Sequence, residues 1–439
     1  MIDRYKFLSG LFFGAMWALL TFGFISEELL PPLASLRSLV FFLCDTIFLV
    51  LGIYSLRNKR DIFVVVTFLF IGITSCVLNH IGLLFGLNGA RDFFGLLFAV
   101  PICRLFLTSK YRERFIESFD KQLLIFLIIQ AFCMTWQFVR YGANDHGGGC
   151  MGFGFSGIAS TLIYIISFYL ISKRWKYGNY WGEMVRNKLY FFLLYPTFLN
   201  ETKISFVFLL AYFLLLLPFE WKTALKILIS LPIMISAMVG IGMAYLFITG
   251  QSVESVFTQA AMDDYLIGED PEELLDLAQY VQDGTYDIED IGVLDIPRFT
   301  KIFFIPEALD DAEGGELWGA GLGQFKGGSL MELTPYAEKW NWVLSGSIPY
   351  LFFVMIQLGV LGLAWFLYTV ATLFLHKSKV FMGLNIKLFI LLIFSLIMTY
   401  NDSLRFFPFC AIIFYILIIG YVNCEDDVES KPVLEGHNQ

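Results

Sequence analysis

A dozen apolar stretches, most of them long enough to cross a lipid bilayer, surround one long acidic segment near residues 250–345. This segment holds 20 of the 39 acidic residues of the chain and only four basic ones. The hydrocarbon core of a membrane has no water to solvate such charges, so the segment must lie outside it. The sequence therefore predicts a bundle of membrane helices that carries one external lobe.

Composition agrees with a membrane protein, because 57% of the residues are hydrophobic and only 16% are charged. We expect an all-α polytopic fold, since helices satisfy their own backbone groups in lipid. No basic patch suggests a nucleic-acid partner. The seven cysteines lie mostly within apolar runs, with only Cys150 in a predicted external loop, so no disulfide framework is expected. No metal-ligand spacing or cofactor motif is present, and we expect neither group.

Twelve spans are predicted, near residues 8–26, 37–55, 62–84, 91–108, 122–140, 155–172, 189–200, 203–220, 227–248, 347–375, 384–400 and 404–422. The seventh is short and forms a tight hairpin with the eighth around Asn200 to Lys203. The expected organisation is a bundle of nine spans over 1–249, the lobe over 250–346, three spans over 347–422 and a tail over 423–439.

Charge fixes the orientation, because 21 of the 30 basic residues fall on the side that also holds both termini. The positive-inside rule makes that side cytoplasmic and places the lobe on the outer side. Nine cations remain on the outer side, where positive charge is otherwise depleted: Arg37, Arg91, Arg140, Lys203, Arg298, Lys301, Lys326, Lys339 and Arg405.

Lys203 lies at the outer tip of the predicted hairpin, where a span begins. An ammonium group beside the unpaired amides of a helix N-terminus suits a phosphate ligand. A lysine that extends to the lipid interface, or pairs with Glu201, explains the same position equally well.

A second candidate is the external loop that follows Arg140, in which glycines flank the sequence Asp145-His146. Glycines let backbone amides approach an anion closely, and a histidine beside a carboxylate is suited to act as a base. For His146 taken alone, an exposed turn is the more frequent outcome. In the lobe, the run Gly319, Gly321, Gly323 lacks the context of a dinucleotide site. It lies between Lys301 and Glu338, so folding of the lobe brings cations and carboxylates over the bundle.

These features together resemble the O-antigen polymerase and ligase superfamily. The resemblance rests on about twelve spans with a large external loop between the ninth and tenth, and on the motif Asn200-Glu201-Thr202-Lys203 at a span end. It also rests on the glycine run 319–323, followed by a span that contains Gln357-Leu358-Gly359-Val360-Leu361-Gly362.

The resemblance implies a GT-C-like bundle and a metal-independent glycosyltransferase without a cofactor, in a bacterial inner membrane with the lobe in the periplasm. Its partners would be an undecaprenyl-diphosphate-linked oligosaccharide donor and acceptor, membrane lipid and a chain-length-regulating copolymerase. By position, Lys203 would contact the diphosphate, with further contacts from Arg298, Arg140, Lys301, Lys326 and Arg405. Candidates for the base are Asp145, His146 and Glu338.

The resemblance also divides into branches. Ligases of this superfamily carry a histidine in the large loop, whereas the lobe here has none. This departure favours a polymerase of repeat units over a ligase that transfers polymer to another acceptor. A transporter of lipid-linked glycans is a further alternative, but transporters place charges at the midplane of the bilayer, and Asp45 is the main charged residue within a predicted span. A purely structural scaffold leaves the outer cations unexplained.

Overall fold

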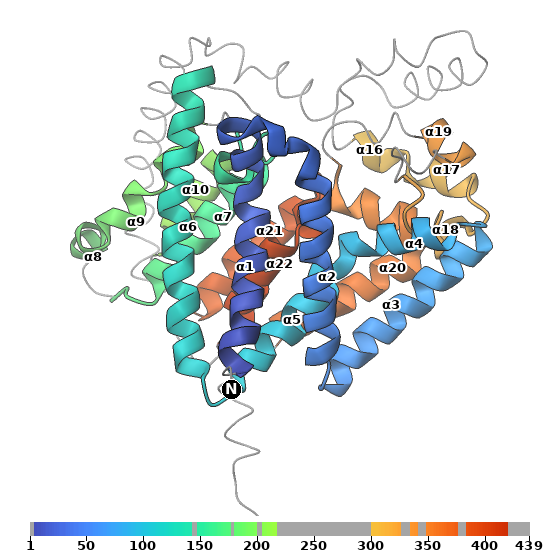
Figure 1. Cartoon of the computed structure of the whole chain (residues 1–439), viewed down its shortest axis with the longest axis horizontal. Coiled ribbons are helices and arrows are strands. Elements are labelled where there is room, and N and C mark those ends of the chain that lie inside the picture. Colours follow the sequence, from blue (N-terminus) through green and yellow to red (C-terminus); the bar gives the residue numbers. More distant parts are fainter. Residues whose placement is uncertain are drawn as a thin grey trace, which may run out of the picture.

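The computed structural model describes residues 4–142, 147–176, 180–199, 204–216, 300–325, 334–340, 348–375 and 383–419 (Figure 1). Within these ranges the protein is mostly helical, as the sequence predicts, and the only β-type pairing is an isolated bridge between Gly147 and Phe153. Five helices are long and apolar enough to cross a membrane. These apolar helices indicate a membrane protein, while the full set of twelve spans stays a prediction.

The first half of the described chain contains these elements: α1 (Arg4–Phe24), the π-helix η1 (Ile25–Leu29), η2 (Pro31–Leu36), α2 (Arg37–Ser55), α3 (Lys59–Leu78), α4 (Leu83–Ala90), η3 (Arg91–Phe93), α5 (Phe94–Leu107), α6 (Arg112–Tyr141), η4 (Gly149–Met151), α7 (Ser156–Ser172), α8 (Tyr180–Arg186), α9 (Lys188–Phe192), η5 (Tyr195–Phe198) and α10 (Ile204–Leu215). The second half contains α16 (Thr300–Phe303), α17 (Ile305–Asp310), α18 (Gly315–Trp318), α19 (Pro335–Trp340), α20 (Tyr350–Phe374), α21 (Gly383–Tyr400), η7 (Ser403–Arg405) and α22 (Phe407–Ile419).

The centre of the bundle is formed by helices that are apolar on every face. In α22 every residue from Phe407 to Ile418 is buried, and α5 and α7 are buried along most of their length. Aromatic rings join these helices to their neighbours: Phe48 of α2 stacks on Phe407 at 3.7 Å, and Phe119 of α6 stacks on Tyr415 at 3.9 Å. A helix without a polar face is stable only when other helices or lipid surround it, so these segments form the core.

The third predicted span, 62–84, ends earlier than expected, because α3 ends at Leu78 and a separate helix α4 follows. The N–H of Ile81 donates to Cys76 O at 2.8 Å and the N–H of His80 donates to Val77 O at 3.3 Å. This pair of bonds is a Schellman cap, in which His80 takes the left-handed position usually held by glycine, with φ of 53°. The cap turns the chain away from the helix axis although the sequence remains apolar.

The seventh predicted span, 189–200, is not one helix, because it consists of the short helix α9 and the 3₁₀ turn η5. It nevertheless forms the first arm of a hairpin with α10. Phe191 stacks on Phe213 at 5.8 Å between ring centroids, and Tyr212 contacts Phe191 edge to face at 5.7 Å. The tip of the hairpin, with Lys203, and the predicted span 227–248 lie outside the described residues.

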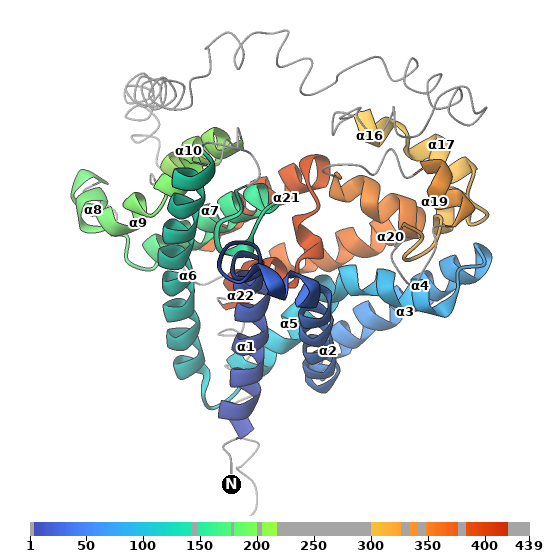
Figure 2. The ribbon, with the colours of Figure 1, turned by 45° about the horizontal axis from the view of Figure 1, so that its top comes forward.

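Helix α20 is interrupted at Gly359, where φ is 64° and ψ is −162°. The described lobe elements α16 to α19 gather beside α20 and the adjoining ends of α3 and α4 (Figure 2). A second small apolar cluster, centred on Phe304, Leu309, Trp340 and Ile356, joins the lobe to the first half of α20.

Candidate functional site

The site that we consider lies at one end of the bundle, where α1 and α6 finish and α2 and α7 begin; we call this the lobe end. Glu27 and Glu28 lie in the π-helical last turn of α1. Glu27 forms an ion pair with Arg37 and also accepts a bond from the backbone N–H of Phe153 at 2.6 Å. Glu28, whose side chain is fully buried, accepts from Arg140 Nη1 at 2.7 Å and from Trp136 Nε1 at 3.3 Å. The wide π turn thus supplies adjacent carboxylates to two other helices.

A chain of alternating charges crosses the same end. Arg405 donates to Asp402 at 2.6 Å and to Asp92 at 3.1 Å, and its guanidinium lies 4.5 Å from the ring centre of Phe353. The neighbouring Arg91 donates from Nε and Nη2 to Asp45 Oδ2, at 2.9 and 2.5 Å. Asp45, the charge expected inside a span, is therefore paired.

The four arginines at the lobe end face five carboxylates: Glu27, Glu28, Asp45, Asp92 and Asp402. Their sum is one negative charge, so these pairs do not by themselves create a positive field for an anion. Removing the arginine of such a pair leaves a largely buried carboxylate, such as Glu28, without its partner, which makes the pairs important for structure. Arg140 and Arg405, predicted as diphosphate contacts, are held by carboxylates in this structure.

The loop that follows α6 is attached to α6 by two glutamine side chains. Gln130 donates to Gly148 O at 2.9 Å and accepts from the backbone N–H of Cys150 at 2.9 Å, while the N–H of Gly149 donates to Gln137 Oε1 at 2.8 Å. The glycines permit this close approach, since a Cβ on Gly149 would lie 2.3 Å from Gln130 Nε2. The candidates Asp145 and His146 fall just outside the described residues.

The hairpin arms run between the two ends of the bundle. Thr197 donates to Tyr164 OH at 3.2 Å, and Phe208 lies 5.7 Å from the same ring, whereas Ser167 meets both Tyr190 O and Tyr212 OH at 3.1 Å. Since α7 starts at the lobe end, the first arm approaches that end and α10 leaves it.

The candidate site residues in the described part of the lobe differ in their exposure to solvent. Lys301 is completely buried in α16, whereas Glu338 is exposed on α19. Lys339 forms an ion pair with Asp311. Burial, with a smaller effect of the Asp311 carboxylate, raises the pKa of Tyr336 above its ordinary value, so the hydroxyl stays neutral and donates to Ala308 O at 2.6 Å. Arg298 and Lys326 lie outside the described residues.

One contact was missed by sequence reasoning. His80 Nε2 lies 3.3 Å from Glu313 Oε2 of the lobe, and both side chains are exposed, at 82% and 65%. The sequence signal was a histidine at a span end, but its partner is more than 200 residues away. The lobe, which contains no histidine, thus contacts one from the bundle.

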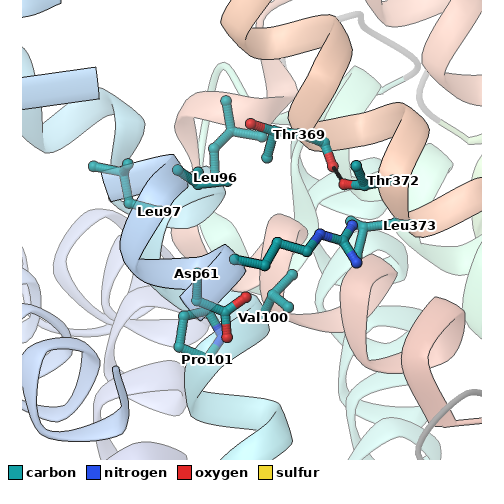
Figure 3. A pocket seen from close by; sticks show the side chains of 10 residues that line it. Asp61, Leu96, Leu97, Val100, Pro101, Thr369, Thr372 and Leu373 are labelled. Carbon is teal, nitrogen blue, oxygen red and sulfur yellow. Dashed lines mark hydrogen bonds between the residues drawn. The ribbon is translucent and has the colours of Figure 1, made fainter. Parts of the chain in front are cut away.

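The small cavity in Figure 3 lies at the opposite end of the bundle, between Asp61, Val100 and Thr369. Its volume of about 20 Å³ suits a water molecule and is far too small for a lipid-linked sugar. The buried pair of Arg104 and Asp61, 2.6 Å apart, stands beside it. Among the described residues, no three His, Cys, Asp or Glu side chains gather closely enough to hold a metal ion.

No known family model matches the sequence, and no curated protein matches it.

Proposed function

We propose that this protein is a glycosyltransferase of the membrane that polymerises oligosaccharide repeat units linked to a polyprenyl diphosphate. The observation that carries the proposal is the direction of the two hairpin arms. Thr197 of the first arm and Phe208 of α10 both contact Tyr164 in the middle of α7, and from there the first arm runs toward the lobe end while α10 runs away from it. The four residues that join the arms, Lys203 among them, connect the end of the first arm to the start of α10.

In the proposed reaction, a hydroxyl oxygen of the acceptor sugar attacks the anomeric carbon of the donor. The bond between that carbon and the diphosphate oxygen breaks, and the diphosphate leaves with the electron pair. A base takes the hydroxyl proton, for which Asp145, His146 and the exposed Glu338 are the candidates. Cations that contact the leaving diphosphate stabilise its developing charge.

The ion pairs at the lobe end favour Lys203 over the arginines for that contact. Arg140 and Arg405 already share their charge with Glu28, Asp92 and Asp402, and Lys301 is buried. A dianion gains little from a cluster whose sum is negative. Lys203, with Arg298 and Lys326, therefore remains the proposed source of positive charge.

The test is to replace Lys203 with alanine and with arginine, and to replace Lys121 of α6 with alanine as a control at the far end. Loss of one charge contact in the transition state costs about a hundredfold or more in rate. We expect Lys203→Ala to abolish the polymer ladder in cells and to slow transfer by the purified protein, whereas Lys203→Arg and Lys121→Ala retain it. Full-length polymer from a normally inserted Lys203→Ala protein would refute the proposal.

A ligase is the second candidate, and the contact of His80 with Glu313 favours it, because it gives the lobe the histidine that its own sequence lacks. Purified protein, supplied with lipid-linked polymer and either a lipid-linked repeat unit or a lipid acceptor, separates the two. Transfer only to the repeat unit supports a polymerase, and transfer only to the other acceptor supports a ligase.

A further inference from the structure

The break in α20 is filled by backbone from the lobe. In a continuous helix the carbonyls of Ile356 and Gln357 would accept from N–H groups four residues later. Here Ile356 O accepts from the N–H of Ala320 at 2.7 Å, and Gln357 O accepts from the N–H of Gly321 at 3.1 Å. Ser75 of α3 adds a second bond to Gln357 O at 3.1 Å. Two backbone N–H groups of the lobe thus take the place of the donors that the next turn of α20 would supply.

Two side chains fix the lobe segment in this position. Gln357 Oε1 accepts from the N–H of Gly323 at 3.0 Å. Asn79, at the end of α3, donates to Gly319 O at 2.8 Å and accepts from the N–H of Gly314 at 3.2 Å. Gln357 and Asn79 therefore bond to lobe backbone before and after Ala320 and Gly321, the two residues that donate to α20.

The approach requires glycine on both partners. A Cβ on Gly319 would lie 2.6 Å from the backbone nitrogen of Gly359, and a Cβ on Gly359 would lie 2.5 Å from the backbone of Leu317. Ala320, Leu322 and Gln357 are buried at this contact. Undocking the segment would leave carbonyls of α20 without donors in an apolar environment, which costs free energy. The bend of α20 and the position of the lobe are consequently coupled.

We propose that Gln357 and Asn79 are positioning residues for the proposed glycosyl transfer, which lock the segment 319–323 onto the bend of α20 and so fix the lobe over the lobe end. This inference rests on the proposed function for its kinetic consequence, but the docking itself is independent of the activity. The residues act through the lobe backbone and touch no substrate.

Docking is measured by cross-linking cysteines placed at His80 and Glu313, whose exposed side chains meet at the same contact. A short bis-thiosulfonate reagent is applied to the full-length protein in lipid nanodiscs. Gln357→Met removes the acceptor while keeping the length of the side chain, and Asn79→Leu removes both bonds of Asn79 to the lobe. We expect Gln357→Met to lower the rate of cross-linking about fivefold, the effect of one buried hydrogen bond, and Asn79→Leu to lower it further, because it removes two such bonds. Gln122→Met on α6, which removes the bond that Trp17 of α1 donates to Gln122, is the matched control and leaves the rate unchanged.

The rate of glycosyl transfer is then measured for the same substitutions in the protein that retains His80 and Glu313. We expect Gln357→Met to lower kcat about fivefold, with KM for the lipid-linked donor changed less than twofold, and Gln357→Glu to restore kcat because it keeps an acceptor oxygen. Unchanged cross-linking in both Gln357→Met and Asn79→Leu would overturn the coupling. Reduced cross-linking with unchanged kcat would overturn the positioning role. If the wild-type protein transfers no sugar although its cross-linking depends on Gln357, the proposed function fails and the coupling stands.

Discussion

At the scale of single residues, several of the described glycines allow close backbone packing, among them Gly319, Gly323 and Gly359. Gly323 and Gly142 have the same φ of 76°, yet a Cβ on Gly323 would lie 2.0 Å from Phe85 O, whereas a Cβ on Gly142 would meet nothing within 4 Å. The two positions therefore share the strain of a left-handed backbone and differ only in steric overlap.

This pair of glycines gives a matched prediction. Gly142→Ala should cost about 1–3 kcal/mol of stability, from backbone strain alone. Gly323→Ala should cost on the order of 2 kcal/mol more, because the methyl group forces α4 away from the lobe. Thermal unfolding of both variants in the same detergent measures the difference. Equal losses of stability would mean that the contact between α4 and the lobe does not form in the membrane protein.

The partners of individual charged residues could not be predicted from the sequence. Arg140 and Arg405 were predicted on the outer side of the membrane, but their partners Glu28 and Asp92, 112 and 313 positions away in the chain, were not predicted. Which carboxylate neutralises which cation depends on how the helices pack, and no local pattern encodes that packing. His80 and Glu313 escaped notice for the same reason.

At the scale of elements, hydrophobic runs predicted α2 and α7 closely, since burial of apolar surface decides those segments, whereas α6 begins at Arg112, ten residues before the predicted span 122–140. They did not predict α4, the π turn η1 or the break at Gly359. These three features depend on tertiary hydrogen bonds to Arg140, Asn79 and the lobe, which override local propensity.

The loop after α6 yields a prediction at this scale. Cys150 is buried, and its Sγ donates to Gln130 Oε1 at 2.8 Å. Burial raises the pKa of the Cys150 thiol well above its ordinary value, with a minor effect of Cys133. Because the folded protein disfavours the thiolate, this thiol stabilises the fold fully below its unfolded pKa, and the contribution is lost as the pH rises through the folded pKa.

Alkylation by a maleimide requires the thiolate, so native Cys150 should stay unlabelled from pH 7 to about pH 9. Gln130→Leu removes the bonds that attach the loop and should make Cys150 reactive at pH 8, more than tenfold faster than in the native protein. Mass spectrometry of the peptide that contains Cys150 provides the measurement, with Gln122→Met as the control. Rapid labelling of the native thiol at pH 7 would show that the loop is not docked on α6.

At the scale of the whole molecule, the two ends of the bundle differ in charge. The described lobe end pairs each of its four arginines with a carboxylate. The opposite end carries many more basic than acidic groups, among them Arg57, Lys59, Arg60, Lys110, Arg112, Arg114, Lys121, Arg174 and Lys176. A membrane that retains positive loops on its cytoplasmic side would therefore insert the chain with the lobe end outward.

This orientation is tested with single cysteines in a cysteine-free background, placed at two exposed sites, Glu313 in the lobe and Arg114 near the start of α6. A membrane-impermeant maleimide should label the Glu313→Cys protein in intact spheroplasts, because the lobe faces the medium. It should label the Arg114→Cys protein only after the membrane is opened. The opposite pattern would place the lobe in the cytoplasm and remove the donor face on which the proposed polymerisation depends. Labelling of both sites in intact spheroplasts would mean that both lie outside, with an even number of membrane crossings between them, and that the paired arginines do not mark a single outer surface.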